Sequence, residues 1–324
     1  MKSRKLLCCL RAPRFPVFRS ARLRGDRPAA VPLRARPGVS GALALAVGVF
    51  GVSLPANAPA YVWDGGGTDD NFGTADNWNP SGAPTTGSGV TLEFGGTVRL
   101  TPNNNYTAFD DFGNLIFVSG AGAFTLGGNA IDLFGKIENN SSNLQTINLS
   151  QIAFQSASAQ LNPVNADLVI NSTDIFTNGN TINVWGNNGH TLTINGVISD
   201  AGGLTINQNS NVVLTAANTY TGTTTITAGS LSVGAGGTTG ALGTTSITNN
   251  ASLILNRSDD FTFANAISGS GSLTKLGGGI ATLTGSNSFS GKTLISAGTL
   301  SIDADSRLGA APGSYVADQL TLNG

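Results

Sequence analysis

The sequence predicts an all-β fold, a right-handed parallel β-helix preceded by a signal segment. From Tyr61 onward the chain contains 31 Asn and 35 Thr, and Thr favours strands while Asn and Gly favour tight turns. Apolar residues alternate with polar ones over short runs, as at Leu253 and Leu255, which is typical of strands. A long segment also repeats, which indicates a stacked fold whose units contact only their neighbours.

Residues 1–60 are predicted to be a basic leader and signal peptide. Eleven of the 17 Lys and Arg residues precede position 37, and Val39 to Leu54 is uncharged and mostly apolar or small. That run suits a signal-peptide core and is short for a membrane-spanning helix, which needs about 20 residues. Ala58 and Ala60 have the spacing of a cleavage site after Ala60. We therefore expect the export machinery to engage the leader, with an uncleaved membrane anchor as the alternative.

The composition of the body excludes several classes of function. From Tyr61 it contains 6 basic and 17 acidic residues, which argues against a nucleic-acid or anionic-membrane partner. Both cysteines, Cys8 and Cys9, lie in the leader, so the body has neither disulfides nor thiolate metal sites. The single histidine, His190, argues against histidine-based catalysis. We expect a protein without enzyme activity.

The internal repeat predicts the architecture. Residues 198–233 align without gaps to residues 267–302, with 15 identities in 36 positions. Coils of a parallel β-helix contain roughly 20–25 residues, so a spacing of 69 residues predicts about three coils. The body would then hold on the order of a dozen coils. Tandem β-sandwiches are the alternative all-β arrangement.

Each coil is expected to bend at a glycine between two strands. Ile226 and Leu231 are five residues apart, so both face the core only if the chain turns at Gly229. Leu231 and Val233 should point inward, as should Leu300 and Ile302 of the second copy. Asn218 and Asn287, with Tyr220 and Phe289, recur at matching positions and are expected to form structural ladders.

The chain therefore divides into three parts. Residues 1–60 are the leader, residues 61–197 an N-terminal cap with degenerate coils, and residues 198–324 the coils with clear repeats. The cores of the two repeats are residues 198–233 and 267–302.

Gly271 to Leu300 resembles the autotransporter-associated β-strand repeat, or passenger-associated transport repeat, of bacterial surface and secreted proteins. The motifs that carry the resemblance are Leu273-Thr274-Lys275, Leu283-Thr284-Gly285, Asn287, Phe289, Gly291, Thr293, Ala297-Gly298 and Leu300. The earlier copy is degenerate, with Ile206 in place of Lys and Ala216 in place of Gly. The opening, residues 61–84, is similar to the usual start of such passenger regions. The resemblance implies a β-helical passenger on the cell surface, in some members followed by an outer-membrane translocator barrel, and no enzyme site within the repeat.

The densest candidate site is a glycine-rich loop near the start of the body. It contains Asp64, Asp69, Asp70, Asn71 and Asp76. Oxygen ligands close in sequence suit Ca²⁺, which takes 6–8 of them, although the spacing matches no established calcium loop. In the alternative interpretation these residues form turns, while Trp63 and Trp78 cap the open end of the helix. No other cofactor is expected.

Two further patterns are candidates for carbohydrate chemistry. Polysaccharide-cleaving β-helix enzymes use clustered carboxylates, and adjacent acidic pairs occur at Asp69-Asp70, Asp110-Asp111 and Asp259-Asp260. Neighbouring residues on a strand point to opposite faces, so such pairs do not form a catalytic dyad alone. His190, near Trp185, is either part of a sugar-binding face or an exposed loop residue.

The leading functional hypothesis is a non-enzymatic, exported or cell-surface structural protein, a β-helical passenger-type stalk or a fragment of one. One alternative is a surface adhesin that binds glycan or cells, and another is a polysaccharide lyase or hydrolase. Residues 317–324 are predicted to be a strand that leads into a further coil, with Leu320 and Leu322 on one face. We therefore expect a piece of a longer passenger, which self-associates through its C-terminal edge.

Overall fold

The computed structural model describes residues 60–186, 189–314 and 316–323. The chain divides into two units, Met1–Val52 and Ser53–Gly324, and the described residues belong to the second. The predicted signal peptide lies almost wholly outside the described residues. Cleavage after Ala60 stays a prediction.

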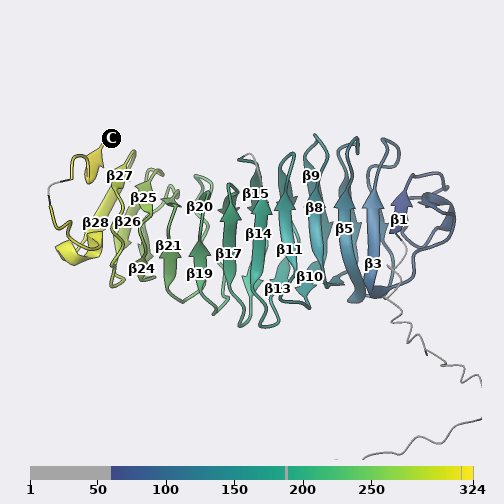
Figure 1. Cartoon of the computed structure of the whole chain (residues 1–324), viewed down its shortest axis with the longest axis horizontal. Coiled ribbons are helices and arrows are strands. Elements are labelled where there is room, and N and C mark those ends of the chain that lie inside the picture. Colours follow the sequence, from purple (N-terminus) through teal and green to yellow (C-terminus); the bar gives the residue numbers. More distant parts are fainter. Residues whose placement is uncertain (1–59, 187–188, 315, 324) are drawn as a thin grey trace, which may run out of the picture. The chain divides into compact units, whose positions relative to one another are not determined.

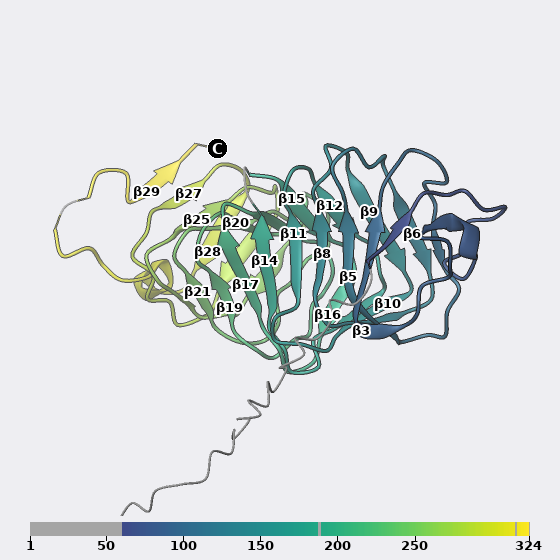
Figure 2. The ribbon, with the colours of Figure 1, turned by 45° about the vertical axis from the view of Figure 1, so that its right-hand side comes forward.

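The second unit is a solenoid of parallel strands stacked along one axis (Figure 1). Successive coils place their strands on three walls, which surround a common core (Figure 2). There are about ten turns, slightly fewer than the dozen expected. The predicted all-β parallel architecture is confirmed, and tandem sandwiches are excluded because the coils stack in parallel.

The three walls, named A, B and C in chain order, are composed as follows. Wall A contains β3 (Gly87–Phe94), β5 (Asp110–Phe117), β8 (Lys136–Asn139), β11 (Gln160–Pro163), β14 (Ile182–Gly186), β17 (Leu204–Gln208), β19 (Thr224–Ile226), β21 (Ile247–Asn249) and β24 (Ile267–Ser268). Wall B contains β4 (Asn103–Asn104), β6 (Thr125–Gly128), β9 (Gln145–Leu149), β12 (Leu168–Ile170), β15 (Thr191–Ile194), β18 (Asn211–Leu214), β20 (Ser230–Val233), β22 (Ser252–Leu255), β25 (Ser272–Lys275), β27 (Thr293–Ile295) and β29 (Leu320–Leu322). Wall C contains β7 (Ile131–Leu133), β10 (Gln151–Phe154), β13 (Asp174–Phe176) and β16 (Val197–Ser199), and later β23 (Phe261–Phe263), β26 (Ile280–Leu283) and β28 (Thr299–Ile302).

Strand β5 is long enough to serve two walls. Its first half pairs with β7 and its second half with β8, so walls A and C belong to one hydrogen-bonded sheet at this end. Between β16 and β23, wall C is continued by two segments without strand structure, residues 218–220 and 241–243. Side-chain and backbone hydrogen bonds hold them in the stack, among them Thr219 N to Ile198 O at 2.9 Å.

The core consists of inward rows of aliphatic side chains. Each row consists of residues that are register partners on successive parallel strands. One row on wall B contains Val212, Leu231, Leu253 and Leu273, none of which has exposed surface. The predicted inward positions of Leu231 and Val233 are confirmed. Leu300 and Ile302 also pack against the core, but only partly buried, because β28 is the last wall-C strand in the described residues. Leu320 and Leu322 are exposed.

The 69-residue repeat does not return to its starting wall. Three coils on wall A, from Leu204 through Thr224 and Ile247 to Ile267, span only 63 residues. The remaining six residues equal one step between walls, as from Ile198 in β16 to Leu204 in β17. Leu204 on wall A therefore corresponds to Leu273 on wall B. The expected spacing of about three coils is corrected to three coils and one further wall.

Glycine forms the corresponding corner in both copies of the repeat, between walls A and B at Gly229 and between walls B and C at Gly298. Gly229 has φ +74° and Gly298 has φ +68°, a backbone region that glycine adopts without steric cost. A Cβ on Gly229 would lie 2.0 Å from Ser210 O of the coil below. The bend predicted at this position is thus required by both backbone conformation and space.

The recurring asparagines tie three coils together. Asn218 Oδ1 accepts a hydrogen bond from Ile198 N at 2.8 Å, while its Nδ2 donates to Ala241 O at 2.7 Å. Asn287 does the same between Ile267 N at 2.9 Å and Arg307 O at 2.6 Å, the latter in the short helix η2 (Asp305–Leu308). Tyr220 and Phe289 fill the core beside them. The expected ladder is confirmed, and it satisfies backbone groups where strands are interrupted.

An aromatic cluster covers the β3 end of the solenoid. It belongs to β1 (Ala60–Trp63), η1 (Ala75–Asn77) and β2 (Trp78–Asn79) with the loops that join them. The rings of Trp63 and Trp78 meet edge to face at 5.1 Å, and Phe72 and Phe94 complete the cluster. Trp78 Nε1 donates to Phe72 O at 2.7 Å, and Trp63 Nε1 to Arg99 O at 3.1 Å. The two tryptophans therefore cap the helix, as the alternative interpretation of this loop expected.

Candidate functional site

The acidic residues of the cap are held by hydrogen bonds within the loop. Asp69 Oδ1 accepts from Thr74 Oγ1 at 2.7 Å and from Asn71 N at 3.0 Å. These donors, the Thr74 hydroxyl first, hold the pKa of the Asp69 carboxyl below its ordinary value. Asp70 accepts from Thr101 and forms an ion pair with Arg99 at 3.1 Å. Both carboxylates thus shape the cap.

The remaining calcium candidates do not converge with them. Asp64 Oδ1 accepts from Gly66 N at 3.0 Å, a local turn, and Asp76 lies in η1. Across the described ranges, no three His, Cys, Asp or Glu side chains are grouped so that they could hold a metal ion. Calcium binding in this loop therefore stays a prediction that the arrangement of these side chains does not strengthen.

The adjacent acidic pairs occupy different environments. Asp259 is bound bidentately by Arg257 at 2.6 and 2.9 Å, and Asp260 Oδ1 accepts from Ile280 N at 2.8 Å. These two carboxylates have structural partners. Asp110 and Asp111 lie in β5, where Asp111 is the register partner of Asp132 in β7.

Asp132 is an acidic neighbour that reasoning from the sequence missed. Burial raises the pKa of its carboxyl, a hydrogen bond from Gln155 lowers it, and the charge of Asp111 raises it further. Parallel stacking creates this pair, because residues one coil apart become direct neighbours. Asp111 and Asp132 are 21 residues apart, which is the length of one coil at this point. The sequence alone does not show this coil length, because it depends on the register between β5 and β7.

Replacing Asp132 with Asn should stabilise the protein at neutral pH. A group whose pKa is raised by folding favours the folded state at pH below its unfolded value, and this contribution is lost as pH rises through the folded value. At pH 7, D132N should therefore raise the free energy of unfolding by roughly 0.2–1 kcal/mol, the size of a cross-strand side-chain effect, because it removes a partly buried charge that also faces Asp111.

The advantage of D132N should shrink on acidification and vanish near the ordinary carboxyl value of 3.8. Circular dichroism during denaturation at pH 4 and pH 7 measures it, with the exposed Asp305→Asn as control. Equal stability of D132N and the parent at pH 7 would contradict a raised pKa for the Asp132 carboxyl.

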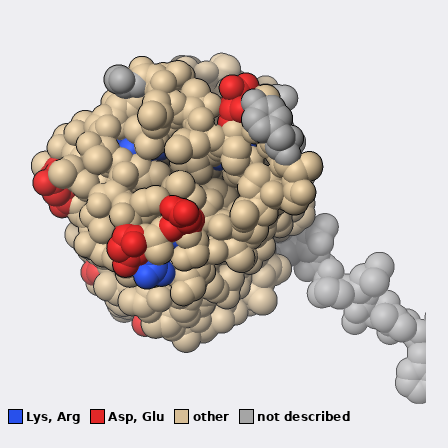
Figure 3. All heavy atoms as spheres, turned by 90° about the vertical axis from the view of Figure 1, so that its left-hand side faces the viewer, with Lys and Arg blue, Asp and Glu red and all other residues tan. Residues whose placement is uncertain are grey.

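Five of the six cations of the body have local partners among the described residues. Besides Arg99 and Arg257, Lys136 pairs with Glu138 at 2.7 Å and Arg307 with Asp303 at 2.7 Å. Lys275 is fully buried, and its Nζ donates to Gly277 O. Figure 3, which faces the end of the solenoid near β28, shows a largely uncharged surface with scattered carboxylates. These cations do not line a groove for an anionic substrate.

Trp185 lies on wall A, and His190 directly precedes β15 of wall B. Trp185 in β14 is 39% exposed, and its backbone N donates to Asn162 Oδ1 at 3.3 Å. His190 Nδ1 lies 3.7 Å from Asp167 Oδ1. Residues 187–188 between them are outside the described residues. The structure leaves His190 half-buried beside a carboxylate, and a sugar-binding role for either residue stays a prediction.

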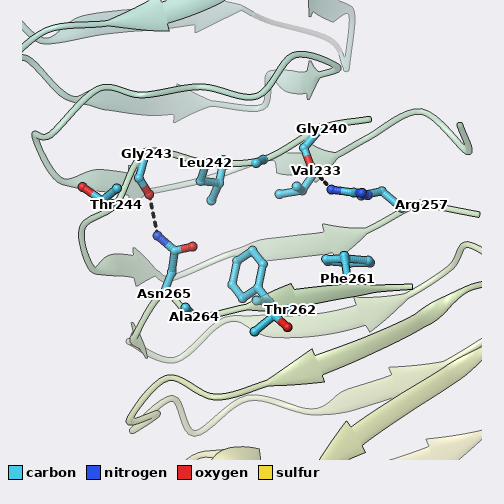
Figure 4. Close-up of a pocket in the computed structure, with 12 residues that line it drawn as sticks. Val233, Gly240, Leu242, Gly243, Thr244, Arg257, Phe261, Thr262, Ala264 and Asn265 are labelled. Carbon is cyan, nitrogen blue, oxygen red and sulfur yellow. Dashed lines mark hydrogen bonds between the residues drawn. The ribbon is translucent and has the colours of Figure 1, made fainter. Parts of the chain in front are cut away.

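A partly enclosed hollow lies on wall C, between residues 240–244 and β23 (Figure 4). Its volume is about 250 Å³. Val233, Leu242 and Phe263 form an apolar floor, and Thr244 and Thr262 lie at the rim. Arg257 Nη1 donates to Gly240 O at 2.9 Å at one end, and Asn265 Nδ2 donates to Gly243 O at 2.6 Å at the other.

This pocket was not predicted from the sequence. The feature of the sequence that could have indicated the pocket is the glycine-rich connection of residues 234–246, between β20 and β21. In most other coils a strand of wall C lies at this position. Arg257 also stacks over the ring of Phe261, with Cζ 4.7 Å from its centroid. The pocket therefore combines an apolar floor with polar groups at fixed positions, which is typical of small-ligand sites.

These features define a parallel β-solenoid assembled from degenerate repeats, in which hydrogen-bonding side chains serve mainly to stack the coils. Residues 210–233 and 273–302 match the family model Passenger-associated-transport-repeat. These two segments of the chain therefore match passenger-associated transport repeats, as the resemblance of Gly271 to Leu300 indicated.

A curated relative supports this assignment. The Adhesin BmaC autotransporter of Brucella suis biovar 1 (strain 1330) is 42% identical over 95 residues, which are 28% of this chain and 3% of that protein. The chain thus covers a small part of its relative. No solved structure gives a significant match. Within the described residues, no helix has the length and apolar character needed to cross a membrane.

Proposed function

We propose that this chain is an exported, non-enzymatic structural protein of the cell surface, a β-helical passenger-type stalk or a segment of one. The observation that carries the proposal is the continuous solenoid with passenger-associated repeats in its coils. The solenoid stacks strands through backbone bonds and a thin apolar core, so its length grows with the number of repeats. No catalytic role is included, because Asp259 and Asp260 have structural partners.

Export of the full precursor from a Gram-negative host tests this proposal. We expect a product outside the cytoplasm whose N-terminus is Tyr61. Leu45→Arg, which places a charge in the apolar run, should retain the protein in the cytoplasm, whereas Leu144→Arg at an exposed position of the body should not. Met1 retained on a soluble cytoplasmic product of the parent chain would contradict the proposal.

A second candidate function is adhesion, and the similarity to an adhesin autotransporter favours it. In this case the surface of the solenoid would bind a glycan or a cell-surface partner. Saturable binding of the purified chain to cells, without turnover of the bound partner, is the expected result. Degradation of an acidic polysaccharide, lost when Asp110 or Asp111 is replaced, would favour the lyase or hydrolase alternative.

A further inference from the structure

The pocket on wall C is a gap in the backbone ladder. Ala241 O accepts from Asn218 N of the coil below, and the two ends of a trans peptide point in opposite directions. Leu242 N–H therefore points toward β23. Phe263 O accepts from Thr284 N of the coil above, so by the same geometry Ala264 N–H points back toward Leu242.

These groups would normally join the two coils. In a continuous parallel ladder, Leu242 N–H would donate to Thr262 O, and Ala264 N–H to Leu242 O. Neither bond is present, although all of residues 240–265 are described. The side chains of Arg257 and Asn265 span the gap in their place, one at each end (Figure 4). Backbone donors and acceptors thus face each other across the hollow.

We propose that this pocket binds an acetamido group, and with it one N-acetylated sugar residue of a glycan. An amide presents one acceptor and one donor on opposite sides, which matches the donors Leu242 N–H and Ala264 N–H and the acceptor Thr262 O. The acetyl methyl group packs on the floor of Val233, Leu242 and Phe263. Thr244 and Thr262 at the rim supply hydroxyls for the sugar ring.

The size of the pocket favours a single sugar residue over a polypeptide. A bound strand would have to pass along the gap, but Arg257 bonded to Gly240 O closes one end and Asn265 bonded to Gly243 O closes the other. A hollow of about 250 Å³ admits one ring with its acetamido substituent. The ligand therefore enters from the solvent side with its acetyl group first.

The inference builds on the proposed surface function by naming a ligand class. The test is a titration of the purified full chain with N-acetylglucosamine, in which binding is measured by calorimetry or ligand-observed NMR. Binding of this sugar is expected, and glucose, which lacks the acetamido group, should not bind. Export, which tests the proposed function, is measured in cells, whereas sugar binding is measured on purified protein. Failure of one proposal can therefore be distinguished from failure of the other.

Blocking variants locate the site. Ala264→Phe and Thr244→Trp place bulk at two exposed lining positions and should each weaken binding at least tenfold. Ala201→Phe, at an exposed alanine away from the pocket, should leave binding unchanged, and the melting temperature of each variant shows whether it is folded. Equal binding of glucose, or undiminished binding by folded blocking variants, would overturn the proposal.

Discussion

Truncation of Leu231 to Ala should lower the free energy of unfolding by about 2–5 kcal/mol, the range for buried leucines that leave a cavity. Leu231 has no exposed surface, and its register partners Val212 and Leu253 lie directly below and above it. The coils on both sides are held at the spacing of the backbone ladder, about 4.8 Å, so they cannot collapse into the void. Denaturant unfolding followed by circular dichroism measures the loss.

Leu276→Ala is the matched control, because Leu276 is 44% exposed and its truncation leaves no enclosed cavity. Leu300→Ala should fall between the two, since Leu300 is only partly covered. Parent-like stability of Leu231→Ala would be incompatible with the inward register of wall B.

Gly229→Val should be the most damaging of the glycine substitutions considered. A β-branched residue at φ +74° is strained, at a cost of about 1–3 kcal/mol for the backbone alone. Its Cβ would also lie 2.0 Å from Ser210 O, so the corner must open and separate two coils. We expect poor yield of folded protein and a strongly lowered melting temperature.

Gly237→Val is the control in the same region of the chain. A Cβ on Gly237 would have no atom within 4 Å, and the residue is not among the positive-φ glycines. Both variants introduce the same side chain. The difference between their melting temperatures therefore measures the effect of the corner at Gly229 and not the general cost of replacing glycine. Similar melting temperatures for both would show that the corner does not require glycine.

The architecture was predictable because the residues that form it act locally. Alternating apolar residues identify strands, and the five-residue spacing from Ile226 to Leu231 places a corner at Gly229. Internal similarity shows that such units are stacked. The wall on which each unit lies depends on the summed lengths of all the turns between units. A spacing of 69 residues therefore predicts about three coils but does not reveal the further step of one wall.

The sites were less predictable for a related reason. Asp111 and Asp132, or Leu242 and Ala264, become neighbours only through the register of successive coils. The cap was predicted in part, since Trp63 and Trp78 are large apolar residues in an otherwise small-residue chain. The role of Asp69 and Asp70, as metal ligands or as hydrogen-bond acceptors that hold the loop, could not be predicted. It depends on hydrogen-bond donors about 30 residues away in the sequence, Arg99 and Thr101, which contact Asp70.

The shift of the repeat by one wall has a consequence for multivalent binding. When a 69-residue unit is duplicated, every outward side chain is copied onto the next wall and not above its original. A recognition motif multiplied in this way winds around the axis as a spiral, so a flat partner surface meets only every third copy. Avidity, which requires that sites be engaged simultaneously, would then favour long, flexible partners that wrap around the protein over rigid ones that lie along one side.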